Sequence, residues 1–300
     1  MPASVTPTLG PPRLTGSAHP PHPRPGAAAP PPIALVALDL DGTLLRTDKR
    51  LTAHTARTIA AVMRRGVRVV LASARPPRSV REVYQHLHLD TLQINYNGAL
   101  IYDPVRRRNV FHLPLTAALV KRIIGFARKM EPALAVSVEV LDKWYTDRVD
   151  DDLATETARH FNPDFIGPID AIVRTPITKL MLLGRPKLLD PVRQAVARKF
   201  AGQIAIAVSN AHLVQIMHPK ADKGVALARI AAGYKIDPRH IMAMGDAPND
   251  LGMLAYAGLA VTVANAWPAV RAQAQFIVPS NDQDGVAHAL QKFVLDSPVR

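Results

Sequence analysis

The sequence predicts an α/β fold built on a parallel sheet, and three stretches indicate it. Residues 33–38 form a short apolar run, with prolines before it and an Asp-x-Asp-Gly turn after it, which is typical of a buried strand. Residues 52–65 have the apolar spacing of an amphipathic helix, a glycine follows, and residues 67–71 form a second apolar run. A right-handed crossover places the two strands of such a unit in one parallel sheet.

Two acids, Asp39 and Asp41, end the first strand. Ligands of open α/β sheets bind beyond the carboxyl ends of the strands, so these carboxylates lie where a pocket is expected. Two carboxylates held close together repel each other, unless a divalent cation lies between them or one of them stays protonated. The alternative is a turn that uses Asp and Gly only for its backbone shape.

A serine, Ser73, follows the second strand and therefore emerges at the same edge as Asp39. Its hydroxyl can donate a hydrogen bond to a phosphoryl oxygen, and it can also cap the helix that follows. Residues 80–87 are expected as helix and residues 93–94 as a short strand, which leads into a turn at residues 95–99.

The apolar patterns of residues 100–212 predict a further α/β unit, although residues 147–169 favour no element. The expected elements are a hairpin at 100–102 and 110–113, helices at 116–129 and 188–200, and strands at 135–140, 178–183, 204–208 and 213–217.

Lys223 opens a helix that ends near Gly233. A lysine at a helix N-terminus opposes the helix dipole, so a structural role alone would cost stability. A phosphate bound beside the ammonium group would reverse that disadvantage.

The last acidic stretch follows an expected strand at residues 241–244, where Gly245 allows a tight turn that exposes Asp246. Asp250 follows four residues later, with Asn249 beside it, at the start of an apolar helix. Acids at a helix start also act as caps, which is the structural alternative for both of them.

Four stretches together resemble the haloacid dehalogenase-like hydrolases. Asp39-Leu40-Asp41-Gly42-Thr43 is similar to the signature of that family. Counterparts of its other motifs follow in the family's order: Ser73 with Arg75, Lys223 with Gly224, and the stretch from Gly245 to Leu254. One such motif is weak support, whereas four in order are strong.

The turn at residues 95–99 is similar to the Asn-Gly-Ala turn of the Cof-type subgroup (subfamily IIB), after which a cap domain is inserted. The resemblance implies a Rossmann-like core, with a parallel sheet and helices on both faces, formed by residues 33–99 and 213–300. It implies an inserted α/β cap of the C2 type at residues 100–212. Because pockets often lie where two domains meet, this cap would close over the acidic edge. It would set substrate preference through side chains such as His112, Trp144, Tyr145 or Arg148.

The resemblance also implies a magnesium-dependent phosphatase, a phosphoric monoester hydrolase that acts on a small phosphorylated metabolite. That metabolite would be a sugar phosphate or a cofactor phosphate such as FMN or pyridoxal phosphate (PLP). Asp39 would be the nucleophile of an aspartyl-phosphate intermediate and Asp41 the general acid and base. Lys223 and Ser73 would assist catalysis. The residues that contact the phosphate would be Ser73, Ala74, Arg75, Asn97, Gly98, Lys223 and Asn249. The ligands of Mg²⁺ would be Asp39, Asp246, Asp250 and the backbone carbonyl of Asp41.

Some positions depart from the family's pattern or select within it. Ala74 stands where many relatives have Gly, and Tyr96 where many have Asn, which puts substrate preference in doubt. Asp41 stands where the family's transport ATPases carry Thr, which favours a phosphatase or a mutase. A phosphomutase is therefore one alternative, and a basic nucleic-acid-binding or regulatory protein on the same scaffold is the alternative from another class.

Composition limits the function classes. The chain has 300 residues, 48% of them hydrophobic, which is enough for the core of one large or two ordinary domains. It contains no cysteine, which excludes disulfides and Cys-ligated zinc and fits a cytoplasmic protein. The formal net charge of +13 is scattered along the chain and aromatic residues make up only 5%, so composition argues against a nucleic-acid partner.

Residues 1–32 are rich in Pro, Ala and Gly and contain no acid, so we expect a disordered extension. Its prolines argue against a transit helix, and it has no apolar region for secretion. Residues 251–270 carry no charge, but their glycines and proline favour a helix end, a strand and a loop over a membrane span. We expect a monomer or a homodimer.

Overall fold

The computed structural model describes residues 32–153 and 158–297. The chain divides into two compact units, and each is described by itself. The core unit holds the described residues up to Ala74, together with Val80–Val110 and those from Asp222 onward. The inserted unit holds Arg75–Ser79 and Phe111–Ala221. The extension expected at residues 1–32 lies outside the described residues, apart from its last residue.

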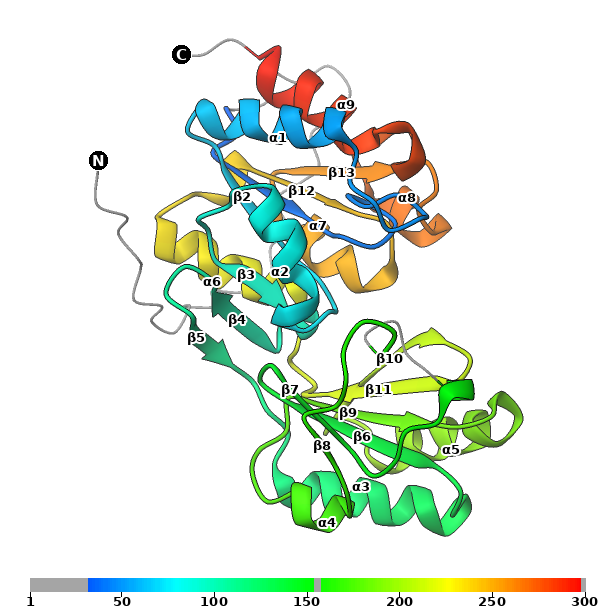
Figure 1. Ribbon diagram of the computed structural model, residues 1–300. Helices are drawn as coiled ribbons and strands as arrows, with labels where there is room; N and C mark the ends of the chain where they lie inside the picture. Colours follow the sequence, from blue (N-terminus) through cyan, green and yellow to red (C-terminus); the bar gives the residue numbers. More distant parts are fainter. Residues whose placement is uncertain (1–31, 154–157, 298–300) are drawn as a thin grey trace. The chain divides into compact units, whose positions relative to one another are not determined.

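The core unit is built on a five-stranded parallel sheet in the order β14-β13-β12-β1-β2 (Figure 1). All residues of β1 are buried, as expected where helices cover both faces of a parallel sheet. Leu38 of β1 pairs with Met244 of β12 and with Leu71 of β2, so the residues that follow these strands emerge at one edge. The strands are β1 (Leu35–Leu38), β2 (Arg68–Leu71), β12 (Ile241–Gly245), β13 (Leu259–Val263) and β14 (Phe276–Val278).

Helices cover both faces of this sheet, with α1 and α9 on one face and α6 and α7 on the other (Figure 1). α1 begins where the Thr52 side chain accepts a hydrogen bond from the Thr55 backbone, and its buried face includes Ile59 and Val62. The predicted fold class is thus confirmed. The helices are α1 (Ala53–Arg64), α2 (Pro77–His86), α6 (Lys223–Tyr234), α7 (Leu251–Tyr256), α8 (Pro268–Gln273) and α9 (Gly285–Leu290), with short helical turns at Pro238–His240, Pro248–Asp250, Asn281–Gln283 and Gln291–Leu295.

A small antiparallel sheet extends the core unit, with β3 (Gln93–Asn95), β4 (Leu100–Asp103) and β5 (Arg108–His112). A helical turn at Tyr96–Gly98 joins β3 to β4, and Gly98 has a φ of +92° there. A Cβ on Gly98 would lie 2.2 Å from the Asp222 carbonyl oxygen, so only glycine fits. The insertion was expected at residues 100–212, but its main segment is Phe111–Ala221. β4 pairs with β3 in the core unit, and the strand Leu213–Met217, expected in the core, pairs within the sheet of the inserted unit.

The inserted unit has a six-stranded sheet in the order β10-β11-β9-β6-β7-β8. Its strand pairs are antiparallel except for β7 with β8. The segment without an assigned element, residues 147–169, contains a helical turn at Asp151–Leu153 and β8. The elements are α3 (Ala117–Met130), β6 (Ala135–Val140), β7 (Lys143–Thr146), β8 (Phe165–Ile166), α4 (Ile169–Ile172), β9 (Lys179–Leu183), α5 (Pro186–Lys199), β10 (Ala205–Asn210) and β11 (Leu213–Met217).

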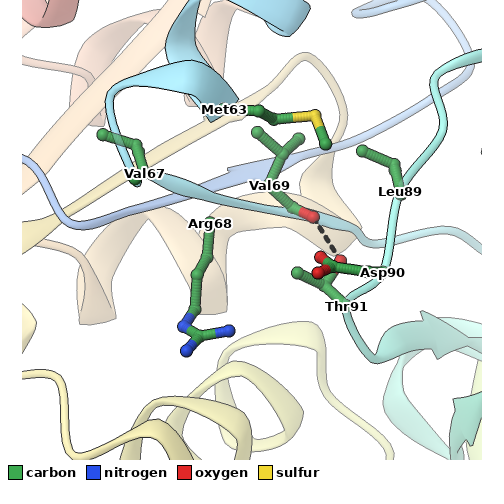
Figure 2. A pocket seen from close by; sticks show the side chains of 8 residues that line it. Met63, Val67, Arg68, Val69, Leu89, Asp90 and Thr91 are labelled. Carbon is green, nitrogen blue, oxygen red and sulfur yellow. Dashed lines mark hydrogen bonds between the residues drawn. The ribbon is translucent and has the colours of Figure 1, made fainter. Parts of the chain in front are cut away.

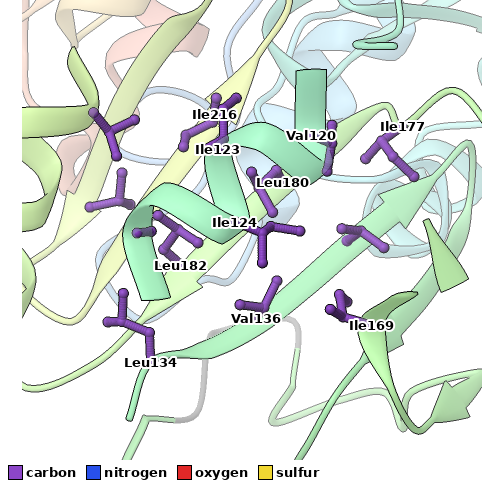
Figure 3. Close-up of a cluster of buried hydrophobic side chains, with 14 of the residues drawn as sticks. Val120, Ile123, Ile124, Leu134, Val136, Ile169, Ile177, Leu180, Leu182 and Ile216 are labelled. Atoms are coloured by element: carbon purple, nitrogen blue, oxygen red, sulfur yellow. The ribbon is translucent and has the colours of Figure 1, made fainter. Parts of the chain in front are cut away.

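One face of this second sheet packs against α3 (Figure 3). Ile123 and Ile124 of α3 lie over Val136 of β6 and Leu182 of β9, and all of these side chains are buried. Successive side chains of a strand point to opposite faces of the sheet, so the strands turn one apolar face toward α3 and the other face away from it. No helix in the described ranges has the length and apolar content needed to cross a membrane.

Candidate active site

The candidate site begins at Asp39, the residue directly after β1. The residue is only 5% exposed, and its Oδ1 accepts a hydrogen bond from Lys223 Nζ at 2.6 Å. The same Nζ donates to Oδ1 of Asp250 at 2.6 Å, and Lys223 is fully buried. The lysine expected at a phosphate therefore bridges two acids.

The start of α6 places this lysine. The Asp222 side chain accepts a hydrogen bond from the Val225 backbone at 2.9 Å, which caps the helix immediately before Lys223. α6 packs along α7, and Asp250 directly precedes α7. The two carboxylates offset the unfavourable position of a lysine at a helix N-terminus.

Asp246 is the third acid at this edge and follows β12. Thr43 Oγ1 donates to its Oδ1 at 2.9 Å, which ties the turn after β1 to the loop after β12. The two loops approach closely at Gly42, where φ is +82° and a Cβ would lie 2.6 Å from Asp246 Oδ2. Glycine is therefore required at this position if Asp246 is to reach the cluster.

Asp250 uses both carboxylate oxygens within the site. Oδ1 accepts from Lys223, and Oδ2 accepts the backbone N–H groups of Asp246 and Ala247, each at 2.9 Å. Asp250 thus shapes the loop that carries Asp246 as well as holding the lysine. Asp39, Asp246 and Asp250 each place one carboxylate oxygen within 4.8 Å of the others, and all three are buried.

The cluster has unbalanced charge, since three carboxylates surround one ammonium group. Burial raises the pKa of Asp39 well above its ordinary value; Lys223 opposes this shift, and Asp250 and Asp246 add to it. Burial also raises the pKa of Asp246 to about 6, although the hydrogen bond from Thr43 acts to lower it. Burial acts to lower the pKa of Lys223, but Asp250 and Asp39 together raise it above its ordinary value. A divalent cation would supply the two missing positive charges, so the donor set fits a hard metal ion.

Asp41 lies apart from the three clustered acids. Its side chain is 38% exposed, and its Oδ1 is 2.8 Å from Lys49 Nζ. We expected the turn to aim both of its carboxylates at one point, but Lys49, eight residues further along, holds Asp41 instead. Lys49 could not be recognised from the sequence, because a lysine in a polar loop carries no distinctive signal.

Ser73, Asn97 and Asn249 come together at the same edge. The Ser73 carbonyl accepts the Asn97 backbone N–H at 3.1 Å, and the Asn97 side-chain oxygen accepts from Asn249 Nδ2 at 3.0 Å. Ser73 is buried, and its backbone N–H donates to Ile94 of β3. Gly98 follows Asn97 in the turn against Asp222.

The two residues after Ser73 are placed differently. Ala74 is half-buried and ends a stretch of the core unit. Arg75 belongs to the inserted unit, where its guanidinium donates to the Ser79 carbonyl at 3.5 Å. Arg75 as a phosphate contact stays a prediction.

A segment after β13 completes the edge. Asn265 donates from Nδ2 to the Gly42 carbonyl at 2.8 Å, and the Trp267 N–H donates to the Asp246 carbonyl at 2.9 Å. This segment therefore ties together the two loops that carry the acids. The sequence analysis assigned no role to either residue.

Comparison with known proteins decides the family. A profile described as haloacid dehalogenase-like hydrolase matches residues 36–290. The chain belongs to this family. The resemblance stated from the four motifs is thus confirmed, as is the expectation of a hydrolase.

Named relatives of this haloacid dehalogenase-like hydrolase are phosphatases. It is 29% identical to a 5-amino-6-(5-phospho-D-ribitylamino)uracil phosphatase from Bacillus subtilis, covering 86% of this chain and 97% of the relative. It is 26% identical to an HMP-PP phosphatase from Yersinia pseudotuberculosis, covering 88% and 96%. A solved haloacid dehalogenase-like hydrolase from Bacteroides thetaiotaomicron has 25% identity and a TM-score of 0.78, covering 87% and 99%.

A recess elsewhere in the core unit contains none of the predicted site residues (Figure 2). It lies at the start of β2, the end opposite the acids, and its volume is about 210 Å³. That is below the usual size of a metabolite pocket, which is roughly 300–1,000 Å³. Its lining residues are Met63, Gly66, Val67, Arg68, Val69, Leu89, Asp90 and Thr91.

Proposed function

We propose that this protein is a magnesium-dependent phosphatase that hydrolyses a small phosphorylated metabolite through an aspartyl-phosphate intermediate. The observation that carries the proposal is the buried cluster of Asp39, Asp246 and Asp250 around Lys223 at the carboxyl edge of the parallel sheet. When all three acids are ionised, the cluster has two excess negative charges, which suit a divalent cation that would also bind the substrate phosphate.

The metal would be held by Asp39, Asp246 and the backbone carbonyl of Asp41. Asp250 would act beside them, since its two oxygens already bind Lys223 and the backbone of the Asp246 loop. When bound, magnesium neutralises charge on the phosphoryl oxygens and so favours attack by an anion.

In the first step the Asp39 carboxylate attacks phosphorus, and the bond from phosphorus to the leaving oxygen breaks. Lys223, 2.6 Å from Asp39 Oδ1, orients that carboxylate and offsets the charge of the incoming phosphate. Ser73 and Asn249 at the same edge are the further candidates for holding phosphoryl oxygens.

Asp41 would protonate the leaving oxygen and then take a proton from the water that hydrolyses the aspartyl-phosphate, which frees Asp39 and inorganic phosphate. Its pairing with Lys49 on a half-exposed loop means that it must exchange this partner for the substrate. A side chain at the surface can make such a change quickly.

The substrate is proposed as a sugar phosphate or a cofactor phosphate such as FMN or PLP. The two named relatives act on a ribitylaminouracil phosphate and on HMP-PP, which supports small phosphorylated metabolites as the class. A phosphomutase would use the same Asp39 and Asp41 but would return the phosphoryl group to a second hydroxyl.

The test is phosphate release from a panel of phosphorylated sugars, cofactors and nucleotides, with magnesium and with EDTA, for the parent and Asp39→Asn. We expect metal-dependent release in the parent and a loss of at least about 10³-fold in Asp39→Asn, because the nucleophile is removed. Equal release by the variant would overturn the mechanism. Isomerised phosphate ester without free phosphate would indicate the mutase.

A further inference from the structure

Trp267 is the most exposed of the large hydrophobic side chains in the described part of the chain, at 59%. The other tryptophan, Trp144, is 7% exposed and packs in the inserted unit. Tryptophan is usually well buried, since its ring is large and mostly apolar. An indole left in water beside an enzyme's acidic edge therefore needs a reason.

The backbone of Trp267 is fixed at the edge that carries the acids. Its N–H donates to the carbonyl of Asp246 at 2.9 Å, and the carboxylate of Asp246 belongs to the cluster. Asn265, two residues before it, binds the Gly42 carbonyl at 2.8 Å. The Trp267 backbone thus binds the loop that carries Asp246, and the Asn265 side chain ties the same segment to the turn after β1.

The fold uses the backbone at this position but not the ring. The Trp267 carbonyl accepts the Val270 and Arg271 N–H groups at 2.9 and 3.0 Å, which starts α8. Ala266 and Val270 supply the buried contacts on either side. Within the described part of the chain, the indole itself makes no hydrogen bond or ring contact.

We propose that the indole of Trp267 stacks on a planar heteroaromatic ring in the substrate, so that the preferred substrates are phosphates of heteroaromatic compounds. This deepens the proposed phosphatase function and rests on it. A tryptophan on a fixed backbone offers a large flat surface and loses only two side-chain torsions on binding. A planar heteroaromatic ring places its whole π face on the indole, whereas a sugar ring offers only C–H groups and carries hydroxyls that prefer water, so the heteroaromatic ring gains more from stacking.

The first test compares Trp267→Ala with Ile277→Ala, a control of similar exposure (54%) on β14 of the same unit. Both are assayed with FMN and pyridoxine phosphate and with glucose 6-phosphate. For heteroaromatic phosphates we expect Trp267→Ala to raise KM about tenfold with kcat little changed, the usual cost of losing a stacked ring. The KM for glucose 6-phosphate should rise clearly less than that, and Trp267→Phe should restore most of the loss for the heteroaromatic phosphates.

The second test reads binding without turnover. Asp39→Asn is titrated with pyridoxine phosphate in magnesium, and tryptophan emission is followed; this ligand has no aldehyde that would react with lysines. We expect saturable quenching that disappears in Asp39→Asn/Trp267→Phe, which keeps only the buried Trp144.

Three results would overturn the inference while leaving the phosphatase proposal intact. They are an active parent that hydrolyses sugar phosphates but no heteroaromatic phosphate, an unchanged KM in Trp267→Ala, and an equal KM increase for both substrate classes. A parent that releases phosphate from nothing in the panel would instead contradict the proposed function itself.

Discussion

The two units bury charge in opposite ways. In the core unit, three carboxylates meet one lysine, so the cluster of Asp39, Asp246, Asp250 and Lys223 has an excess of two negative charges. In the inserted unit, Glu139 lies 3.0 Å from Lys179 and 3.4 Å from Arg78, and Arg78 also pairs with Asp142 at 3.5 Å.

This difference teaches how to separate a structural ion cluster from a site. Buried charges that balance one another can be explained by stability and specificity alone. Buried charges that do not balance are costly unless a ligand completes them. The unbalanced cluster is therefore where a divalent cation is expected, and the balanced one is not.

The largest expected effect comes from breaking each cluster at its lysine. Lys223→Met leaves Asp39 and Asp250 without their shared partner, so we expect a loss of about 3–5 kcal/mol in free energy of unfolding at neutral pH. Lys179→Met should cost less, about 1–3 kcal/mol, because Arg78 still faces Glu139. Urea unfolding of both variants measures this.

A matched double variant sharpens the comparison of the two lysines. Lys179→Met/Glu139→Gln should recover most of the stability lost in Lys179→Met, because no buried charge is then left without its partner. If the two single variants cost the same and the double variant recovers nothing, the distinction between the clusters is wrong.

A smaller effect is expected from pH. Burial raises the pKa of Asp246 to about 6, so its folded form holds a proton that the unfolded chain releases near pH 4. The free energy of unfolding in EDTA should therefore fall by up to about 3 kcal/mol as pH rises from 4 to 7 through this group. In Asp246→Asn that contribution is absent.

The difference between parent and Asp246→Asn melting curves at each pH reports this group together with its effect on Asp39, whose pKa Asp246 also raises. Burial also lowers the pKa values of His112 and His218, which opposes the trend below pH 6.5, but both histidines are present in the two proteins. If the free energy of unfolding depended on pH in the same way in the parent and in Asp246→Asn, burial would not raise the pKa of Asp246.

The smallest effect is expected at the exposed pair of Asp41 and Lys49. With side chains 38% and 46% exposed, the pair is screened by water, so Lys49→Met should change the free energy of unfolding by less than about 1 kcal/mol. A loss as large as that in Lys223→Met would mean that exposure does not separate the two pairs. The change in stability caused by Lys49→Met is measured by thermal melting at low and high salt.

The sequence was most informative where one apolar run predicted both a strand and the residues that follow its carboxyl end. The apolar run before Asp39 predicted β1, and the parallel crossover predicted that Ser73 emerges at the same edge. The alternating pattern also located β6, β9 and β11, whose buried strands carry the core of the inserted unit.

Side-chain partners over long separations could not be predicted. Asp250 looks like a helix cap in the sequence, yet its oxygens bind Lys223 and the Asp246 loop, and this depends on how α6 meets α7. The partner of Asp41 was missed for another reason: Lys49 is only eight residues away, but a lysine in a polar loop carries no distinctive signal. The hairpin β4–β5 joined the core unit because β3, only three residues long, offered it an edge to pair with.

The central claim is that the unbalanced cluster binds a divalent cation, and calorimetric titration of metal-free protein with magnesium tests it most directly. We predict one saturable site in the parent, loss of that site in Asp246→Asn, and an unchanged site in Lys179→Met/Glu139→Gln. The account would be contradicted by no binding in the parent, or by equal binding in the parent and Asp246→Asn.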